Sequence, residues 1–214
     1  MKLFFHPLSS YSQKTLMAFY EKNVPFVPEL VQLMEPAARA EYKKLYPLGK
    51  LPLLQLENGR LIPESSIIIE YIDTQVDSGP TLIPFDIDLG RRTRFHDRQF
   101  DFYVNNPMMT ILFDGLKPPE ARNPAAVAQA RETLDTMYPY LDELFGKRTY
   151  ALGDTFTMAD CAAAPALAYC RMVHPFDGFK HLSAYSHRLA ERPSFARVQK
   201  EAAPYLEAMM GGAR

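Results

Sequence analysis

Residues 49–65 read GKLPLLQLENGRLIPES, and this stretch decides the fold. Two apolar runs, Pro52–Leu56 and Arg60–Ile62, flank the turn sequence Glu57-Asn58-Gly59. Asn-Gly between two apolar runs is the strongest short-range signal for a β-hairpin. A helical spacing of apolar residues begins soon after, at Ile67. The stretch therefore predicts two antiparallel strands followed by a helix.

Upstream of this hairpin, strand and helix patterns alternate. Lys2–Phe5 and Phe26–Leu33 are short runs that predict strands, while Ser9–Lys22 and Pro36–Leu45 carry helical patterns. Alternation of this kind predicts a parallel pair of strands, to which the hairpin adds an antiparallel edge. The predicted order is β-α-β-α-β-β-α, with a mixed four-stranded sheet.

Downstream, we find no further strand pattern. A stretch rich in glycine and proline, Ser78–Pro84, predicts a linker. Helical patterns fill the rest of the chain, at Leu89–Phe113, Ala125–Leu144, Met158–Met172, Leu182–Leu189 and from Phe195 onward. The sequence thus predicts an α/β domain over residues 1–78, a linker over 79–87 and an all-helical domain over 88–214.

The composition of the 214 residues excludes several classes of protein. It is 47% hydrophobic and 23% charged, with a formal net charge of −1, which is typical of a soluble globular chain. There is no basic tract for nucleic acid or an anionic membrane surface, and no apolar run reaches the roughly 18 residues of a membrane span. The opening MKLFFHP lacks the apolar core of a signal peptide. We expect a cytoplasmic protein that binds neither nucleic acid nor membrane.

Cysteine and histidine give no sign of a disulfide framework or a metal site. Cys161 and Cys170 are too few for such a framework and lie in an Ala-rich helical pattern, so we expect small buried thiols. The five histidines lack an H-x-x-x-H pair and a cysteine partner at metal-binding spacing. The sequence therefore predicts no metal cofactor.

Four short motifs occur in order along the chain: Ser9-Ser10-Tyr11-Ser12, Gly49-Lys50-Leu51-Pro52, Pro63-Glu64-Ser65 and Gly153–Asp160. Together they resemble the cytosolic glutathione transferases over essentially the whole chain. The similarity is to serine-type members of the bacterial kind, close to the theta, zeta and tau branches. It implies a thioredoxin-like N-terminal domain that binds glutathione as co-substrate, a helical C-terminal domain that binds a small apolar electrophile, and a homodimer.

Ser9 lies where the first loop meets the first predicted helix. A thiol with a pKa of about 8.5 must become a thiolate to attack, and a helix N-terminus beside a donating hydroxyl favours that anion. The resemblance implies that Ser9 is this catalytic hydroxyl, with Ser10 in the place of the family's proline, and that Ser10 and Tyr11 also contact glutathione. Tyr11 remains a competitor for the sulfur. For Ser9 itself, the alternative is an ordinary N-cap.

The second motif resembles the family's loop before a cis-proline. The resemblance implies a cis Leu51–Pro52 bond, pairing of the Leu51 backbone with the cysteinyl backbone of glutathione, and contact of Lys50 with the glycyl carboxylate. From the residues alone, Pro52 begins an edge strand and Lys50 is solvated. The family usually has Asn where this chain has Tyr46.

Pro63-Glu64-Ser65 opens the third predicted helix. The resemblance implies that Ser65 and the helix N–H groups bind the γ-glutamyl carboxylate, and that Glu64 accepts from the γ-glutamyl ammonium. The alternative is a capped helix start. In the fourth motif, Thr157-Met158-Ala159-Asp160 has the form of a capping box with Asp in place of Glu or Gln, and we expect a structural role only.

The helical domain supplies candidates for the electrophile pocket. Tyr103, Met109 and Phe113 belong to an apolar stripe of the kind that usually forms core, but in this family the inner face of that helix lines the pocket. The resemblance also implies that a residue such as Asp101 approaches glutathione from the partner subunit. We expect a glutathione transferase acting on an apolar electrophile, with peroxidase or isomerase side activity. The alternative is a non-catalytic member that binds glutathione or hydrophobic ligands.

Overall fold

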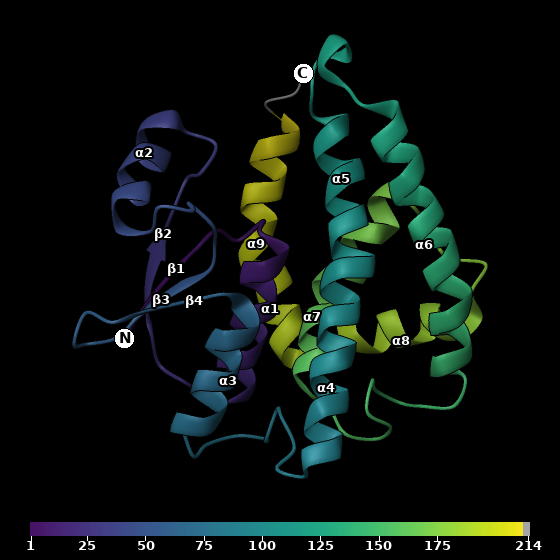
Figure 1. Ribbon diagram of the computed structural model, residues 1–214, viewed down its shortest axis with the longest axis horizontal. Helices are drawn as coiled ribbons and strands as arrows, with labels where there is room; N and C mark the ends of the chain where they lie inside the picture. Colours follow the sequence, from purple (N-terminus) through teal and green to yellow (C-terminus); the bar gives the residue numbers. More distant parts are fainter. Residues whose placement is uncertain (212–214) are drawn as a thin grey trace. The chain divides into compact units, whose positions relative to one another are not determined.

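The computed structural model, drawn in Figure 1, describes residues 1–211 and divides into two compact units. Unit 1 comprises residues 1–82 together with the chain from Pro193 onward, and unit 2 comprises residues 83–192.

Unit 1 is built on a mixed four-stranded sheet, as predicted. Its strands, in the order β2-β1-β3-β4, are β1 (Lys2–Phe5), β2 (Val27–Leu30), β3 (Leu53–Gln55) and β4 (Leu61–Pro63). β1 is parallel to β2 and antiparallel to β3, and β3 is antiparallel to β4. The predicted hairpin is confirmed, and Gly59 in its turn has φ +83, which favours glycine.

Three helices alternate with the strands in the predicted order: α1 (Ser10–Glu21), α2 (Pro36–Leu45) and α3 (Ser65–Gln75). α1 and α3 pack against each other (Figure 1). Successive side chains of a strand point to opposite faces of a sheet. Leu53 accordingly packs with Tyr42 of α2, while its neighbour Leu54 is buried on the other face. This is the expected thioredoxin-like arrangement.

The last helix, α9 (Pro193–Gly211), packs against α1 within unit 1. From the sequence, this segment was assigned to the helical domain 88–214. The pattern of an amphipathic helix identifies its apolar face but does not show which surface covers that face. Around the expected linker, residues 76–86 form neither helix nor strand.

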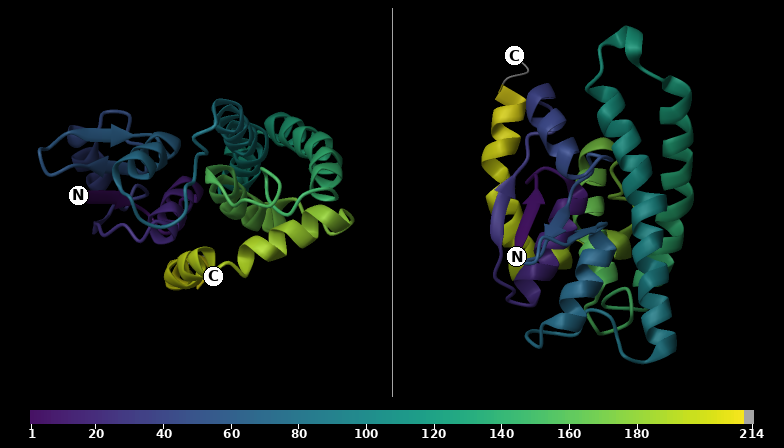
Figure 2. Two further views of the ribbon diagram at one scale, coloured as in Figure 1. Left: turned by 90° about the horizontal axis from the view of Figure 1, so that it is seen from below. Right: turned by 60° about the vertical axis from the view of Figure 1, so that its left-hand side comes forward.

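Unit 2 consists of helices joined by loops. They are α4 (Ile87–Phe100), the π-helical segment η1 (Asp101–Asn105), α5 (Asn106–Gly115), the 3-10 turn η2 (Pro119–Ala121), α6 (Pro124–Phe145), α7 (Met158–Val173) and α8 (Lys180–Ala190). α4, η1 and α5 follow one another without a break, and Figure 2 shows this rod beside α6. Within residues 83–192 the only β-type pairing is an isolated bridge between Tyr150 and Gly153. The predicted all-helical character of this part of the chain is therefore confirmed.

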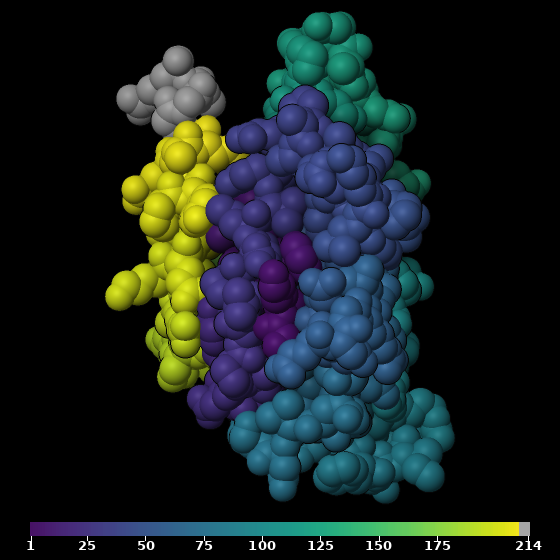
Figure 3. All heavy atoms as spheres, turned by 90° about the vertical axis from the view of Figure 1, so that its left-hand side faces the viewer, coloured from purple at the N-terminus to yellow at the C-terminus, as the bar shows by residue number. Residues whose placement is uncertain are grey.

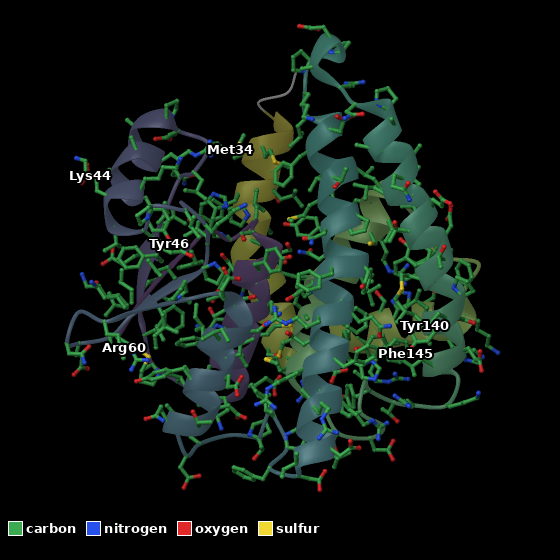
Figure 4. All side chains as sticks on the ribbon, in the orientation of Figure 1. Met34, Lys44, Tyr46, Arg60, Tyr140 and Phe145 are labelled. Carbon is green, nitrogen blue, oxygen red and sulfur yellow. The ribbon has the colours of Figure 1, made fainter. Side chains whose placement is uncertain are left out.

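The start of α7 anchors the core of unit 2. Asp160 is fully buried and accepts from the N–H groups of Ala151 (2.9 Å) and Thr157 (2.8 Å). It also accepts from the hydroxyls of Thr157 (3.1 Å) and Tyr185 (2.6 Å). Tyr185 stacks on Phe145, with ring centroids 3.6 Å apart; Phe145 is labelled in Figure 4. The predicted capping box is present, and the carboxylate of Asp160 has a structural role in it.

Both cysteines are buried on α7, as expected. Burial raises the pKa of the Cys170 thiol to about 12. This sulfur therefore carries a proton at neutral pH.

Candidate functional site

Three of the four motifs meet at one edge of the sheet in unit 1. The register pairs Phe4 with Leu53, and Leu53 with Pro63. β1 and β4 run toward this edge and β3 runs away from it, because both pairings with β3 are antiparallel. The loop after β1, the Leu51–Pro52 segment before β3 and the start of α3 after β4 therefore lie together.

A buried side-chain contact joins two of these segments. Lys14, in the second turn of α1, donates from Nζ to the hydroxyl of Ser66 over 2.9 Å. Both residues are buried, and Ser66 lies in the first turn of α3. The contact therefore holds the starts of the two helices close to each other.

His6 fixes the loop between β1 and α1. Its C=O accepts from the N–H of Ser9 over 2.9 Å, and its Nδ1 accepts from the N–H of Leu8 over 3.2 Å. Because Nδ1 accepts, the ring proton sits on Nε2, which lies 3.2 Å from Oε1 of Gln32. Burial lowers the pKa of His6, although the Gln32 contact opposes this. The imidazole is therefore neutral at pH 7, and its hydrogen bonds fix the conformation of the loop.

Ser9 is the N-cap of α1. It has φ −76 and ψ 118, and its Oγ accepts from the N–H of Ser12 over 3.3 Å. The N-cap interpretation is thus correct, yet it leaves the hydroxyl proton uncommitted, since a serine oxygen can accept and donate at once. Within residues 1–211 no group accepts that proton, and Ser9 is partly exposed.

The other hydroxyls of the first motif are placed differently. Ser12 is fully buried, and its Oγ accepts from the N–H of His6 over 3.4 Å. Ser10 is buried as the first residue of α1, and Tyr11 is half-buried in the same turn. Ser9 is the member of this run that stands outside the helix. The choice between Ser9 and Tyr11 at a bound sulfur stays a prediction.

The Leu51–Pro52 bond is cis, which confirms the expectation. Leu51 is buried, yet in the described chain neither its N–H nor its C=O has a hydrogen-bond partner. Backbone groups of buried residues are normally paired, so an N–H and a C=O without a protein partner can pair with the backbone of a ligand. Lys50 is exposed and has no carboxylate partner among residues 1–211, while its C=O accepts from Tyr42 over 2.8 Å.

The start of α3 combines backbone strain with an uncapped helix end. Glu64 has φ +71 and ψ 122, a conformation that costs a residue with a side chain about 1–3 kcal/mol. Its side chain is exposed and makes no cap hydrogen bond. Ser65, the first residue of the helix, is buried behind it. Uncapped N–H groups at the positive end of a helix form an anion-binding site.

Two family matches cover most of this chain. Residues 8–75 match the description "Glutathione S-transferase, N-terminal domain", and residues 104–193 match "Glutathione S-transferase, C-terminal domain". This chain belongs to the glutathione S-transferase family.

Similar proteins cover most of the chain. Glutathione S-transferase GstA of Escherichia coli O157:H7 is 27% identical over 202 residues, covering 90% of this chain and 94% of GstA. A stringent starvation protein A homolog of Coxiella burnetii is 28% identical over 217 residues, covering 99% of this chain and 97% of the homolog. A crystal structure of a glutathione S-transferase from Methylobacterium radiotolerans, in complex with glutathione sulfonate, is 27% identical with a TM-score of 0.80. That match covers 92% of this chain and 93% of the other.

Tyr46 is a neighbour of the candidate site, and the sequence assigned it no role. It follows α2, and Figure 4 shows it between that helix and the sheet. Burial raises the pKa of Tyr46, and the negative charge of Glu64 raises it further. The available signal was its position in the loop, where the family usually has Asn.

Sequence reasoning also missed the residues that hold the Ser9 loop. The side-chain amide of Gln13 donates to the C=O of Pro7 over 2.7 Å, and His6 makes the contacts described above. The signal for both was local, since His6-Pro7 ends β1 and Gln13 lies one turn into α1.

The candidates for the electrophile pocket lie in unit 2. Tyr103 in η1 and Phe113 in α5 are 53% and 51% exposed, and Met109 in α5 is partly buried. Asp101 is buried at the start of η1. Their assignment to a pocket or an interface stays a prediction.

In the described part of the chain, no group of three or more His, Cys, Asp or Glu side chains is arranged to hold a metal ion. Across the same residues, no helix combines the length and apolar character needed to cross a membrane.

Proposed function

We propose that this chain is a glutathione transferase that binds glutathione at the sheet edge formed by Ser9, Leu51 and Ser65. It stabilises the glutathione thiolate for attack on an apolar electrophile. The observation that supports this most is the meeting of three unsatisfied groups at one edge: the Ser9 hydroxyl proton, the Leu51 backbone and the uncapped start of α3.

The sulfur is bound at the N-terminus of α1. There the helix dipole favours an anion, and Ser9 donates its free proton to the thiolate. The thiol proton passes to solvent when the thiolate forms. The thiolate then attacks an electrophilic carbon, a C–S bond forms and the leaving group departs with its electron pair. Holding both reactants in one site supplies the rest of the acceleration.

The remainder of the tripeptide matches the charges along the edge. The cysteinyl backbone pairs with Leu51 beside cis Pro52, and the glycyl carboxylate meets Lys50. The γ-glutamyl carboxylate takes the N–H groups and hydroxyl at Ser65, and the γ-glutamyl ammonium meets Glu64. Ser10 and Tyr11 complete the contacts near the sulfur. Each charge of the ligand then has a partner of opposite sign or a helix N-terminus.

The electrophile is small and apolar, and Tyr103, Met109 and Phe113 contribute to its pocket. We further propose a two-fold homodimer, in which a residue such as Asp101 approaches the γ-glutamyl group of the partner's ligand. Light scattering at micromolar concentration tests the assembly, and a monomer contradicts it. The setting is a reducing cytoplasm, which keeps the thiol of glutathione free.

A second candidate is a non-catalytic member of the family that binds glutathione. The observation in its favour is that the relative covering 99% of this chain is named a stringent starvation protein A homolog and not a transferase. Peroxide reduction and isomerisation are further activities that the same thiolate supports.

The deciding experiment combines retention and turnover. The chain is applied to immobilised glutathione and eluted with free glutathione, and turnover of 1-chloro-2,4-dinitrobenzene, a hydroperoxide and an isomerisable substrate is followed. We expect retention and measurable conjugation. Lys50→Ala should weaken retention, whereas Lys44→Ala, an exposed lysine on α2 that pairs with Glu41, should not. Retention without turnover on any electrophile supports the non-catalytic candidate, and loss of both contradicts glutathione binding.

A further inference from the structure

Lys14 is enclosed in unit 1, with 1% of its surface exposed. It lies in the second turn of α1, and α1 packs against both α3 and α9. Figure 3 shows a face of unit 1 on which α9, in yellow, borders the N-terminal part of the chain. Lysine is almost never fully buried unless it is paired, because its ammonium is costly to take out of water. The groups around Lys14 therefore indicate what its charge does.

A second buried lysine of α1 provides a comparison. Lys22 lies about two helical turns beyond Lys14, at the C-cap of α1, and is 4% exposed. Its Nζ is 3.1 Å from a carboxylate oxygen of Asp73, in the last turn of α3. This buried ion pair joins the C-terminal ends of α1 and α3, and its role is structural.

At the start of the same two helices, the partner that α3 offers is neutral. Lys14 donates from Nζ to the hydroxyl of Ser66 over 2.9 Å, and Ser66 is itself buried. Ser66 follows Ser65 in the first turn of α3, where the N-cap residue makes no side-chain hydrogen bond to the helix. The N-terminus of a helix carries a partial positive charge, and the ammonium of Lys14 adds to it. An anion bound at this helix start is therefore attracted by both.

We propose that Lys14 is a positioning residue for the γ-glutamyl carboxylate of glutathione. Its hydrogen bond to Ser66 fixes the first turn of α3, and its charge attracts the carboxylate that binds at Ser65. A hydroxyl that accepts from an ammonium also becomes a stronger donor, so Ser66 passes part of this attraction to the edge. The inference rests on the proposed function, because it concerns the same glutathione edge. Lys14 governs the affinity for glutathione, whereas Ser9 governs the pKa of the bound thiol.

Two substitutions separate the charge of Lys14 from its hydrogen bond. Lys14→Gln keeps a donor for Ser66 and removes the charge, while Lys14→Arg keeps the charge. Calorimetric titration should show glutathione bound about tenfold more weakly by Lys14→Gln, the effect of one unit charge several ångströms away in a partly screened site. Lys14→Arg should retain most of the affinity. Thiolate absorbance against pH should show the thiol pKa little changed in either variant.

The other buried lysine supplies the matched control. Lys22→Met combined with Asp73→Asn removes that ion pair but leaves an oxygen for the N–H of Leu82, which donates to Asp73 over 2.9 Å. This double variant should change the urea midpoint and leave glutathione affinity unchanged. Urea curves verify that each variant is folded. Ser66→Ala removes only the hydroxyl that Lys14 contacts, so it is the milder test, and it should also weaken glutathione.

Two glutathione analogues locate the effect on the ligand. In one the γ-glutamyl carboxylate is replaced by a carboxamide, and in the other the glycyl carboxylate is replaced in the same way. Wild type should prefer glutathione to the first analogue, and Lys14→Gln should lose about tenfold of that preference. The second analogue should be weakened by Lys14→Gln as much as glutathione itself, because its γ-glutamyl carboxylate is intact.

The outcomes distinguish this inference from the proposed function. If wild type fails to bind glutathione at millimolar concentration, both are overturned. If wild type binds but Lys14→Gln has the affinity of the Lys22→Met/Asp73→Asn control, the inference alone is overturned. It is also overturned if Lys14→Gln weakens glutathione and the γ-glutamyl carboxamide equally, since the charge then acts on another part of the ligand.

Discussion

The N-termini of α1 and α7 look alike in sequence, but their hydrogen bonding differs. Thr157 and Asp160 at α7 are fully buried, and the carboxylate of Asp160 accepts from four donors. Ser9 at α1 is partly exposed, and its hydroxyl accepts one hydrogen bond while no described residue takes its proton. At the start of α7 the hydrogen bonds are saturated. The start of α1 retains a donor at the positive end of a helix, where an anion is favoured.

The start of α3 extends this comparison. Glu64 offers no side-chain cap and holds a strained φ, so this helix end is less satisfied than either of the others. Natural proteins usually satisfy buried polar groups, and exceptions concentrate at sites that bind or react. A structural cap is therefore distinguished from a candidate binding site by whether the polar groups at the helix start have all their hydrogen-bond partners. The residue types at the helix start do not distinguish them.

The largest effect should come from removing the saturated cap. Asp160→Ala leaves at least three buried donors, on Ala151, Thr157 and Tyr185, without their acceptor. Each such loss costs about 1–3 kcal/mol, so we expect the free energy of unfolding to fall by about 3–5 kcal/mol. Urea unfolding at pH 7 measures this.

A matched control lies in the same motif. Asp154 is exposed and accepts from the Thr149 hydroxyl over 2.7 Å, so Asp154→Ala should cost less than about 1 kcal/mol. Equal losses for the two variants would show that saturation does not set the importance of a cap. A surviving folded fraction of Asp160→Ala should bind glutathione with an unchanged thiol pKa.

The next effect should be specific to the unsaturated cap. Ser9→Ala removes one charge-assisted hydrogen bond, which is worth about 1.5–3 kcal/mol, or roughly one to two units in the pKa of bound glutathione. Conjugation at neutral pH should fall by about tenfold or more and return in part at high pH, with glutathione affinity little changed. Thiolate absorbance against pH, together with the rate profile, measures both.

The neighbouring hydroxyls provide the controls for Ser9. Ser12 is fully buried and Ser10 is buried in the helix, so Ser10→Ala and Ser12→Ala should move the thiol pKa much less. If substitution of Tyr11 changes the pKa of the bound thiol and Ser9→Ala does not, the assignment of Ser9 as the donor to the sulfur is wrong. If none of the four moves it, the helix terminus alone activates the thiol or the chain is not a transferase.

Much of the fold could be predicted from the sequence, because the elements concerned depend on residues close together in the chain. The Asn58-Gly59 hairpin, the alternation before it and the helical patterns after it follow from short-range rules, so sheet and helices were predicted. The capping box at Thr157 was readable for the same reason. The resemblance supplied Ser9 and cis Pro52, which periodicity alone does not reveal.

The rest depended on contacts between distant residues. The packing of α9 on α1, the buried Lys14–Ser66 contact and the electrostatic influence of Glu64 on Tyr46 join segments far apart in the chain. Backbone strain at Glu64 is likewise invisible in its residue type, because Glu is not a residue that usually adopts positive φ. The cavity lined by α1, the segment leading into β2 and α9 is formed from both ends of the chain and could not be predicted at all.

Glu64 allows strain and ligand binding to be separated. Glu64→Gly relieves the positive φ, and we expect unit 1 to gain about 1 kcal/mol in stability while glutathione affinity falls about tenfold. Glu64→Gln keeps the strain and removes the charge, so it should lose affinity without gaining stability. Urea unfolding and calorimetric titration of glutathione give the two readouts. A destabilised Glu64→Gly would mean that the conformation is not strained.

The smallest effect concerns the loop that positions Ser9. Burial lowers the pKa of His6 below its ordinary value of about 6.5. Above that pH the folded and unfolded chains both hold a neutral imidazole, so His6 adds no pH dependence. As the pH falls from there through the folded pKa, the unfolded chain binds the proton more readily and the free energy of unfolding decreases. The physical reason is that burial disfavours the charged imidazolium; a protonated Nδ1 can also no longer accept from the N–H of Leu8.

His6→Asn retains an oxygen that can accept this N–H but does not titrate, so its urea midpoint should fall less than wild type between pH 7 and pH 5. His96→Asn is the matched variant in unit 2, where burial also lowers the pKa of a histidine. Both should flatten the pH dependence of stability, but only His6→Asn should also keep the Ser9 loop ordered in acid. Hydrogen exchange of the Leu8 and Ser9 amides at pH 5 distinguishes them. Equal protection of those amides in the two variants would show that the α1 start does not depend on the charge of His6.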